Sequence, residues 1–156
     1  MNGKTLPNAT NPDEVQVNEA TRCGFVAILG APNVGKSTLL NRLVGTKVSI
    51  VTPKVQTTRR RILGITIREQ TQLVFIDTPG IFTPRQNKRL EQAIVKTAWS
   101  AAYDADRLLL LVDAKRGLDR DTQTVLDGLG QSNRRATLAL NKLDLVKPPA
   151  LLPLIK

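Results

Sequence analysis

Residues 30–37 have the types and spacing of a phosphate-binding loop. They read GAPNVGKS and match the pattern G-x-x-x-x-G-K-[ST], whose glycines let backbone N–H groups close around phosphate oxygens. Lys36 is expected to reach the β- and γ-phosphates, and the Ser37 hydroxyl is expected to bind Mg²⁺. The other predicted nucleotide contacts of this segment are Asn33, Val34, Gly35 and Thr38.

The elements on either side of this loop must present it to the phosphates. The apolar run 24–29 predicts a buried strand, and residues 37–44 predict a helix. A helix N-terminus carries roughly half a positive charge, so it attracts phosphate groups. A plain glycine-rich turn is the alternative interpretation, and the flanking strand and helix favour phosphate binding over it.

A second motif, Asp77-Thr78-Pro79-Gly80, ends the predicted buried strand at 72–76. A carboxylate at this place can meet a phosphate-bound Mg²⁺, directly or through water. Asp77 is therefore the predicted metal-holding aspartate, and the Gly80 N–H is predicted to contact the γ-phosphate. Taken alone, the same four residues are more typical of a plain turn.

The motif Asn141-Lys142-Leu143-Asp144 indicates which base is bound. Guanine presents two adjacent N–H donors, and the single carboxylate of Asp144 can accept both. Adenine lacks that donor pair and would leave the carboxylate unpaired. Asn141 is expected to bind the remaining polar edge of the base and to hold the loop in place. Lys142 is expected to lay its aliphatic stem along the base. Without the other motifs, a helix-capping Asn with solvated charges would be the better interpretation.

Composition narrows the classes of chemistry and of partner. The chain has 156 residues, 41% of them hydrophobic but only 3% aromatic, which fits one domain with an aliphatic core. A single cysteine and no histidine exclude a disulfide framework, a Cys/His zinc site and Ser-His-Asp catalysis within the chain. The net charge of +10 is consistent either with RNA as a partner or with a solvated basic surface.

The rest of the sequence predicts alternating strands and helices after a disordered polar tail at 1–22. A strand at 59–68 is expected to form a hairpin with 72–76. Leu90, Ile94, Ala98 and Ala101 fall on one helical face, beside which Trp99 is expected to pack. Further predicted elements are a strand at 107–112, a helix at 119–129 closed by Gly130, a strand at 136–140 and a helical start at 151–155. This order predicts an α/β fold, a doubly wound and mostly parallel sheet with helices on both faces.

Four motifs follow one another along the chain. They are GAPNVGKSTLLN at 30–41, QTTR at 56–59, DTPGI at 77–81 and the N-K-x-D motif at 141–144. In that order they resemble the Era/TrmE-like family of translation-factor-class GTPases, and 47–50 with 56–59 favour its Era branch. The resemblance covers residues 24–156. It implies a Ras-like G domain, a P-loop fold that binds GTP or GDP with Mg²⁺ and alternates between the two states.

The resemblance also implies residue roles. Thr58 is expected to bind Mg²⁺ in the GTP state and to share the catalytic roles with Lys36 and Gly80, with Thr57 as second choice. Asn33 is similar to an asparagine with which some relatives hold K⁺. Ile81 stands where Ras-type enzymes carry a water-orienting Gln, so slow turnover is expected, on the order of 10⁻⁴–10⁻² s⁻¹. Arginines that could assist the reaction, contact RNA or remain solvated are Arg59, Arg60, Arg61 and Arg85.

The implied role is a GTP-hydrolysing switch in small ribosomal subunit assembly and 16S rRNA maturation, acting in the cytoplasm as a monomer. Peripheral contact with the inner membrane is left open. The family places an RNA-binding KH domain and a last guanine-binding loop beyond the segment matched here. The chain is therefore expected to end within its G domain, with weakened nucleotide binding and an exposed sheet edge. The alternatives are an RNA-associated module without effective turnover, or a related GTPase of tRNA modification, large-subunit assembly or iron transport.

Overall fold

The computed structural model describes residues 21–49 and 62–155. Thr57, Thr58 and the arginines at 59–61 lie outside the described residues, as do residues 1–20 of the predicted tail. The apolar runs form a five-stranded sheet in the order β2-β3-β1-β4-β5. Its strands are β1 (Arg22–Leu29), β2 (Ile62–Arg68), β3 (Thr71–Asp77), β4 (Arg107–Asp113) and β5 (Ala136–Asn141).

Four of the five strands run parallel, as the alternation of strands and helices predicts. β1 pairs in parallel with β3 and β4, and β4 pairs in parallel with β5. Only β2 runs antiparallel, because it forms the predicted hairpin with β3, with Leu63 opposite Ile76. Consequently the C-terminal ends of β1, β3, β4 and β5 meet at one edge of the sheet.

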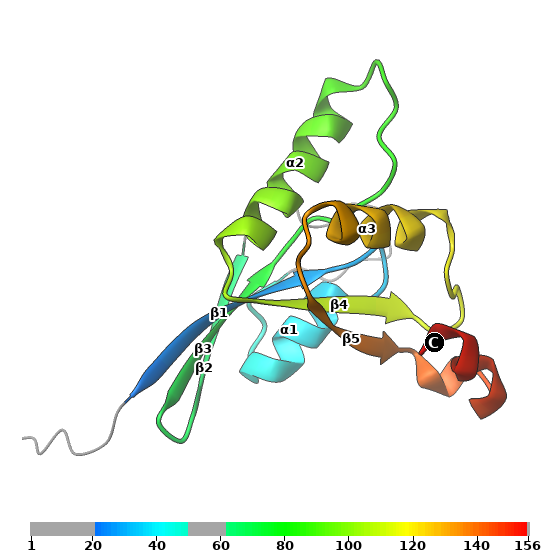
Figure 1. Cartoon of the computed structure of the whole chain (residues 1–156). Helices are drawn as coiled ribbons and strands as arrows, with labels where there is room; N and C mark the ends of the chain where they lie inside the picture. The colour runs from blue at the N-terminus through cyan, green and yellow to red at the C-terminus, as the bar shows by residue number, and fades with distance from the viewer. Residues whose placement is uncertain (1–20, 50–61, 156) are drawn as a thin grey trace, which may run out of the picture.

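Helices cover both faces of the sheet (Figure 1), which confirms the predicted fold class. α1 (Lys36–Val44) lies on one face, where Leu40 packs with Ile28, Phe75 and Leu111. α2 (Arg89–Asp104) and α3 (Arg120–Gln131) lie on the other face. There Ala98, Ala101 and Val125 pack against strand residues such as Leu29 and Leu110.

Two details of the helices differ from the prediction. Leu90 is 65% exposed, although the 3.6-residue period places it with the buried residues Ile94, Ala98 and Ala101. It sits in the first turn of α2, at the end that projects away from the sheet (Figure 1), so nothing covers it. Gly130 does not close α3, which continues to Gln131. The left-handed residue that follows is Asn133, whose N–H donates to the carbonyl of Gly130.

Trp99 is a packing residue, as predicted. Its side chain is partly buried against the core, and a Cβ added at Gly128 would lie 2.2 Å from its ring. The predicted helix at 151–155 is instead a short 3₁₀ helix, Pro148–Leu154. Pro148 and Pro149 stand at the start of the segment, where a helix tolerates proline, but Pro153 lies inside it and lacks the N–H group that a regular α-helix needs there. A shorter 3₁₀ helix, Leu143–Leu145, precedes it.

Candidate nucleotide-binding site

The polar residues of the site lie where the parallel strands end. The phosphate loop follows β1, and Asp77, Asp113 and Asn141 are the last residues of β3, β4 and β5. Ligands of doubly wound sheets bind outside these strand ends. The topology therefore brings together three motifs that are separated by up to about a hundred residues of chain.

Glycine is required at two positions of the phosphate loop. Gly30 has φ 151° and Gly35 has φ 103°, conformations that other residues rarely adopt. An added Cβ would lie 2.4 Å from the carbonyl oxygen of Leu111 at Gly30, and 2.4 Å from Nδ2 of Asn141 at Gly35. The loop thus approaches the ends of β4 and β5 too closely for any side chain at these positions.

The ammonium of Lys36 folds back over the phosphate loop. Its Nζ donates to the carbonyls of Gly30, at 3.0 Å, and Ala31, at 2.8 Å, and the side chain is buried. Burial lowers its pKa from 10.5 to about 8, against the opposing effect of the Asp77 charge. A bound phosphate group would supply a further negative charge and stabilise the protonated form of Lys36.

The predicted metal ligands Ser37 and Asp77 are in direct contact. Oγ of Ser37 donates to Oδ2 of Asp77 at 2.6 Å, and Asp77 is fully buried. Ser49 donates to the same oxygen, also at 2.6 Å. A hydroxyl beside a carboxylate is an oxygen donor set that suits Mg²⁺, so the residues present fit this ion. Ser49 was not predicted as a site residue, because its only signal in the sequence was its place in the family-like run 47–50.

The side chain of Asn41 brings Ser49 to this place. Its Oδ1 accepts hydrogen bonds from the N–H groups of Val48 and Ser49, and its Nδ2 donates to the carbonyl of Ser49. Asn41 lies on α1, one turn beyond Ser37, so the helix that follows the phosphate loop also fixes the segment after it. Asn41, the last residue of the GAPNVGKSTLLN stretch, therefore has a structural role.

The D-T-P-G segment packs directly on the phosphate loop. Oγ1 of Thr78 donates to the carbonyl of Ile28 at 2.6 Å, and the N–H of Ile81 donates to the carbonyl of Gly30 at 3.1 Å. A Cβ added at Gly80 would lie 2.7–2.9 Å from atoms of Pro32. The side chain of Ile81 is fully buried in the core.

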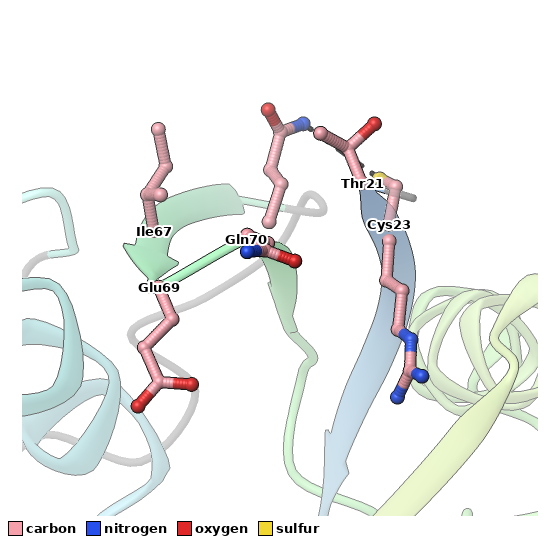
Figure 2. A pocket seen from close by; sticks show the side chains of 7 residues that line it. Thr21, Cys23, Ile67, Glu69 and Gln70 are labelled. Carbon is pink, nitrogen blue, oxygen red and sulfur yellow. Dashed lines mark hydrogen bonds between the residues drawn. The ribbon is translucent and has the colours of Figure 1, made fainter. Parts of the chain in front are cut away.

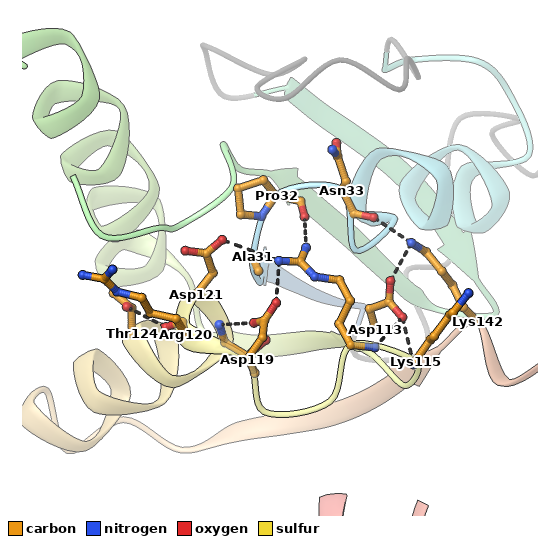
Figure 3. A network of polar contacts seen from close by, with 12 residues as sticks. Ala31, Pro32, Asn33, Asp113, Lys115, Asp119, Arg120, Asp121, Thr124 and Lys142 are labelled. Atoms are coloured by element: carbon orange, nitrogen blue, oxygen red, sulfur yellow. Dashed lines mark hydrogen bonds and ion pairs between the residues drawn. The ribbon is translucent and has the colours of Figure 1, made fainter. Parts of the chain in front are cut away.

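The N-K-x-D motif is fastened to the phosphate loop by two side chains. Nδ2 of Asn141 donates to the carbonyl of Val34 at 2.8 Å, which is the tether predicted for this residue. Nζ of Lys142 donates to the carbonyl of Asn33 at 2.9 Å and to Oδ2 of Asp113 at 2.6 Å (Figure 3). Asp144 is exposed on the 3₁₀ helix Leu143–Leu145, so its carboxylate is accessible to a base.

Arg85 forms an ion pair with Glu91, away from the phosphate loop. Nε and Nη2 of its guanidinium both donate to Oε1 of the Glu91 carboxylate, and this side-chain hydrogen bonding lowers the pKa of Glu91. Arg85 is thereby held at the start of α2, and the described contacts give it no bond to the phosphate loop. This arrangement favours the solvated interpretation of Arg85 over direct assistance to the reaction.

A hollow of about 380 Å³ lies at the other end of β1, beside the β2–β3 turn (Figure 2). Its lining consists of Thr21, Arg22, Cys23, Ile67, Glu69, Gln70 and Gln72. The phosphate loop is at the opposite end of β1, so this hollow is separate from the candidate site.

Among the residues placed in the structure, no helix combines the length and apolar character needed to cross a bilayer.

Comparison with known proteins agrees with this geometry. A family model described as "50S ribosome-binding GTPase" matches residues 25–142. A protein of Bradyrhizobium sp. (strain ORS 278) named GTPase Era is 55% identical over 136 residues, which make up 87% of this chain. The chain spans only 44% of the length of that relative.

Two solved structures resemble the chain closely. One is a crystal structure of Era with MgGDPNP and nucleotides 1506–1542 of 16S ribosomal RNA, with a TM-score of 0.78 and 42% identity. The other is a single-residue variant of Aquifex aeolicus Era bound to GDP·AlF4⁻, with a TM-score of 0.78 and 40% identity. The likeness covers 87% and 86% of this chain, and 46% of each of the two solved chains.

Proposed function

The chain belongs to the family of 50S ribosome-binding GTPases, and we propose that it binds GTP and GDP and hydrolyses GTP with Mg²⁺. The observation that carries this proposal is the fastening of the N-K-x-D motif to the phosphate loop. Asn141 and Lys142 donate to the carbonyls of Val34 and Asn33, at 2.8 and 2.9 Å. These bonds support the proposal, because they hold the motif that is proposed to read guanine against the loop that is proposed to hold the phosphates.

In the proposed mechanism, the phosphate loop binds the nucleotide through its backbone N–H groups and the Lys36 ammonium. Ser37 and Asp77 would hold Mg²⁺, which neutralises charge that develops on the phosphate oxygens. The N–H of Gly80 would contact the γ-phosphate, because Gly80 packs against Pro32 of the loop. Thr58 is proposed as a further ligand in the GTP state.

The orientation of the attacking water must come from groups other than Ile81. Its side chain is fully buried, so it contributes shape to the core and no hydrogen bond to water. We therefore propose that backbone groups, the metal ion or a partner supply this function, with K⁺ held at Asn33 as an additional charge. The expected result is slow intrinsic turnover, on the order of 10⁻⁴–10⁻² s⁻¹.

The proposed biological role is assembly of the small ribosomal subunit. The support is the 55% identity to a relative named GTPase Era and the likeness to an Era crystal structure that contains 16S ribosomal RNA. The net charge of +10 also suits a partner made of RNA, because lysine and arginine side chains neutralise phosphates. We propose that the protein acts in the cytoplasm as a monomeric switch on this particle.

The test is phosphate release from GTP in the presence of Mg²⁺ and K⁺. The chain, its Lys36→Ala variant and the matched Lys96→Ala control, which alters an exposed lysine of α2, are compared. We expect slow release from the chain and from the control, and loss of release in Lys36→Ala. Binding without phosphate release would instead support a nucleotide-binding module, and equal rates in all three proteins would overturn the proposed function.

A further inference from the structure

Three consecutive carbonyls of the phosphate loop are held by side chains from outside it. The donor–acceptor pairs are Arg116 Nη1 with Pro32 at 2.9 Å, Lys142 Nζ with Asn33 at 2.9 Å, and Asn141 Nδ2 with Val34 at 2.8 Å. Only Lys142 and Asn141 belong to a recognised nucleotide motif. Arg116 comes from the connection between β4 and α3, to which no role is assigned.

These bonds set the direction of the loop's N–H groups. A trans peptide is planar, and its C=O and N–H point in opposite directions. A carbonyl that is held outward therefore turns the N–H of the following residue inward. The N–H groups oriented in this way are those of Asn33, Val34 and Gly35, which the proposed function assigns to the phosphates.

Asp113 forms an ion pair with Lys142, the residue whose ammonium donates to the carbonyl of Asn33. Asp113 is 4% exposed, and its Oδ2 lies 2.6 Å from Nζ of Lys142 (Figure 3). The N–H groups of Lys115 and Arg116 donate to its Oδ1, at 2.9 and 3.3 Å. Desolvation by burial raises the pKa of Asp113, but these hydrogen bonds, led by that of Lys142, outweigh it and leave the pKa below its ordinary value. Asp113 is thus a fixed negative charge that holds the Lys142 ammonium against the loop.

Arg116 is fixed by a comparable pair of carboxylates. Its Nη2 forms ion pairs with Asp119 and, at 3.6 Å, with Asp121. Asp119 is also the N-cap of α3, where its Oδ1 accepts the N–H of Thr122 at 2.9 Å. The start of α3 therefore holds the guanidinium in place while Nη1 donates to the carbonyl of Pro32.

We infer that Asp113 and Arg116 are positioning residues of the nucleotide site, which orient the phosphate loop through Lys142 and through the Pro32 carbonyl. This inference rests on the proposed guanine-nucleotide binding. It extends the site to a connection that neither the phosphate loop nor the N-K-x-D motif includes. Nucleotide affinity then depends on these two residues through the orientation of the loop N–H groups.

A double-mutant cycle tests the route through Lys142. GDP affinity is measured for the chain, Asp113→Asn, Lys142→Met and the double variant, with Asp127→Asn on the exposed side of α3 as control. Asp113→Asn removes the charge but keeps the shape, and we expect it to weaken GDP binding by about tenfold. The double variant should bind no more weakly than Lys142→Met alone, because Asp113 acts through that residue.

The route through Arg116 has its own pair of variants. Arg116→Met keeps the side-chain length and loses the guanidinium, whereas Arg120→Met makes the same change at an exposed position four residues later. We expect weaker GDP binding in Arg116→Met and no change in Arg120→Met. In the nucleotide-free protein, the amide NMR resonance of Asn33 should shift in Arg116→Met only.

The outcomes separate the inference from the proposed function. If the unmodified chain binds no GDP, the proposed function fails, and the inference is then decided by NMR without nucleotide. Asp113→Asn should shift the Val34 amide resonance in the unmodified chain but not in the Lys142→Met background. The inference is overturned if the losses of affinity or the resonance shifts add in full in the double variant. It is also overturned if both positioning variants lower only the melting temperature.

Discussion

The hydroxyl of Ser37 donates to Oδ2 of Asp77 across a separation of 40 residues, at 2.6 Å. This bond joins the first turn of α1 to the last residue of β3. The same two oxygens form the donor set that Mg²⁺ would take, so the proton of the hydroxyl must turn away when the ion binds. The pair therefore connects the fold of the chain to its proposed metal dependence.

Replacement of Ser37 by alanine should remove the metal effect on nucleotide binding. The variant loses one oxygen ligand, and we expect its Mg²⁺ affinity to fall by at least about tenfold. The measurement is GDP dissociation with and without EDTA, which should accelerate release from the unmodified chain but change release from Ser37→Ala little. Ser132→Ala, at the C-terminal end of α3, is the control, since its hydroxyl donates to the carbonyl of Leu129. An equal EDTA response in Ser37→Ala would contradict the assignment.

Gly80→Ala should lower both stability and nucleotide affinity. The new methyl group would lie 2.7–2.9 Å from Cα, N and Cγ of Pro32, so the phosphate loop would have to move. Overpacking of this kind costs about 1–3 kcal/mol of unfolding free energy. Gly24→Ala provides the comparison, because its nearest neighbour, Oδ2 of Asp106, would be at an ordinary 3.8 Å. Urea denaturation and GDP titration measure the two effects, and unchanged values for Gly80→Ala would refute the packing argument.

Two glycines of α3 should respond to alanine with opposite sign. At Gly128 the added Cβ would lie 2.2 Å from the ring of Trp99, whereas at Gly130 it meets nothing within 4 Å. Gly130→Ala should stabilise the protein by roughly 0.5–1 kcal/mol, since alanine is the better helix former. Gly128→Ala should destabilise it by about 1–3 kcal/mol. Thermal unfolding of the two variants measures both changes in stability. If both variants were stabilised, the described contact between Gly128 and Trp99 would be contradicted.

The charge of Asp113 predicts a pH-dependent contribution to stability. Its pKa in the fold is below the ordinary value of 3.8, so the folded state favours the carboxylate. That contribution is fully present above the ordinary pKa and is lost as the pH falls through the lower folded value. The difference in unfolding free energy between the chain and Asp113→Asn should therefore shrink as the pH falls from about 5 through the folded-state pKa, which lies below 3.8. Denaturant titrations across this range measure it, and a constant difference would contradict the ion pair with Lys142.

Most of the architecture could be predicted because the aliphatic runs are short, regular and separated by turn residues. The predicted run at 107–112 is one residue shorter than the observed strand at its C-terminal end, and the predicted tract at 72–76 is one residue shorter at each end. The errors come from features that local pattern does not contain. Leu90 has helical spacing, but its exposure depends on where the sheet stops beneath α2.

The site residues that were missed share one physical cause. Ser49 meets Asp77 across 28 residues, and Arg116 meets Pro32 across 84 residues, so neither contact has a signature in a short window of sequence. Asp113 ends a predicted strand, but its partner Lys142 is defined only by the pairing of β4 with β5. The motif residues could be predicted because their spacing along the sequence is fixed. The residues that position them, Ser49, Asp113 and Arg116, become neighbours only through the order of the strands in the sheet.

The most direct measurement of the central claim is the ratio of dissociation constants for ADP and GDP with Mg²⁺ present. Asp144 can pair with the two donors of guanine and with no equivalent pair on adenine. The account predicts a preference for GDP that approaches roughly 10⁴-fold, the discrimination that a polar recognition site can reach. Comparable dissociation constants for the two nucleotides would contradict it.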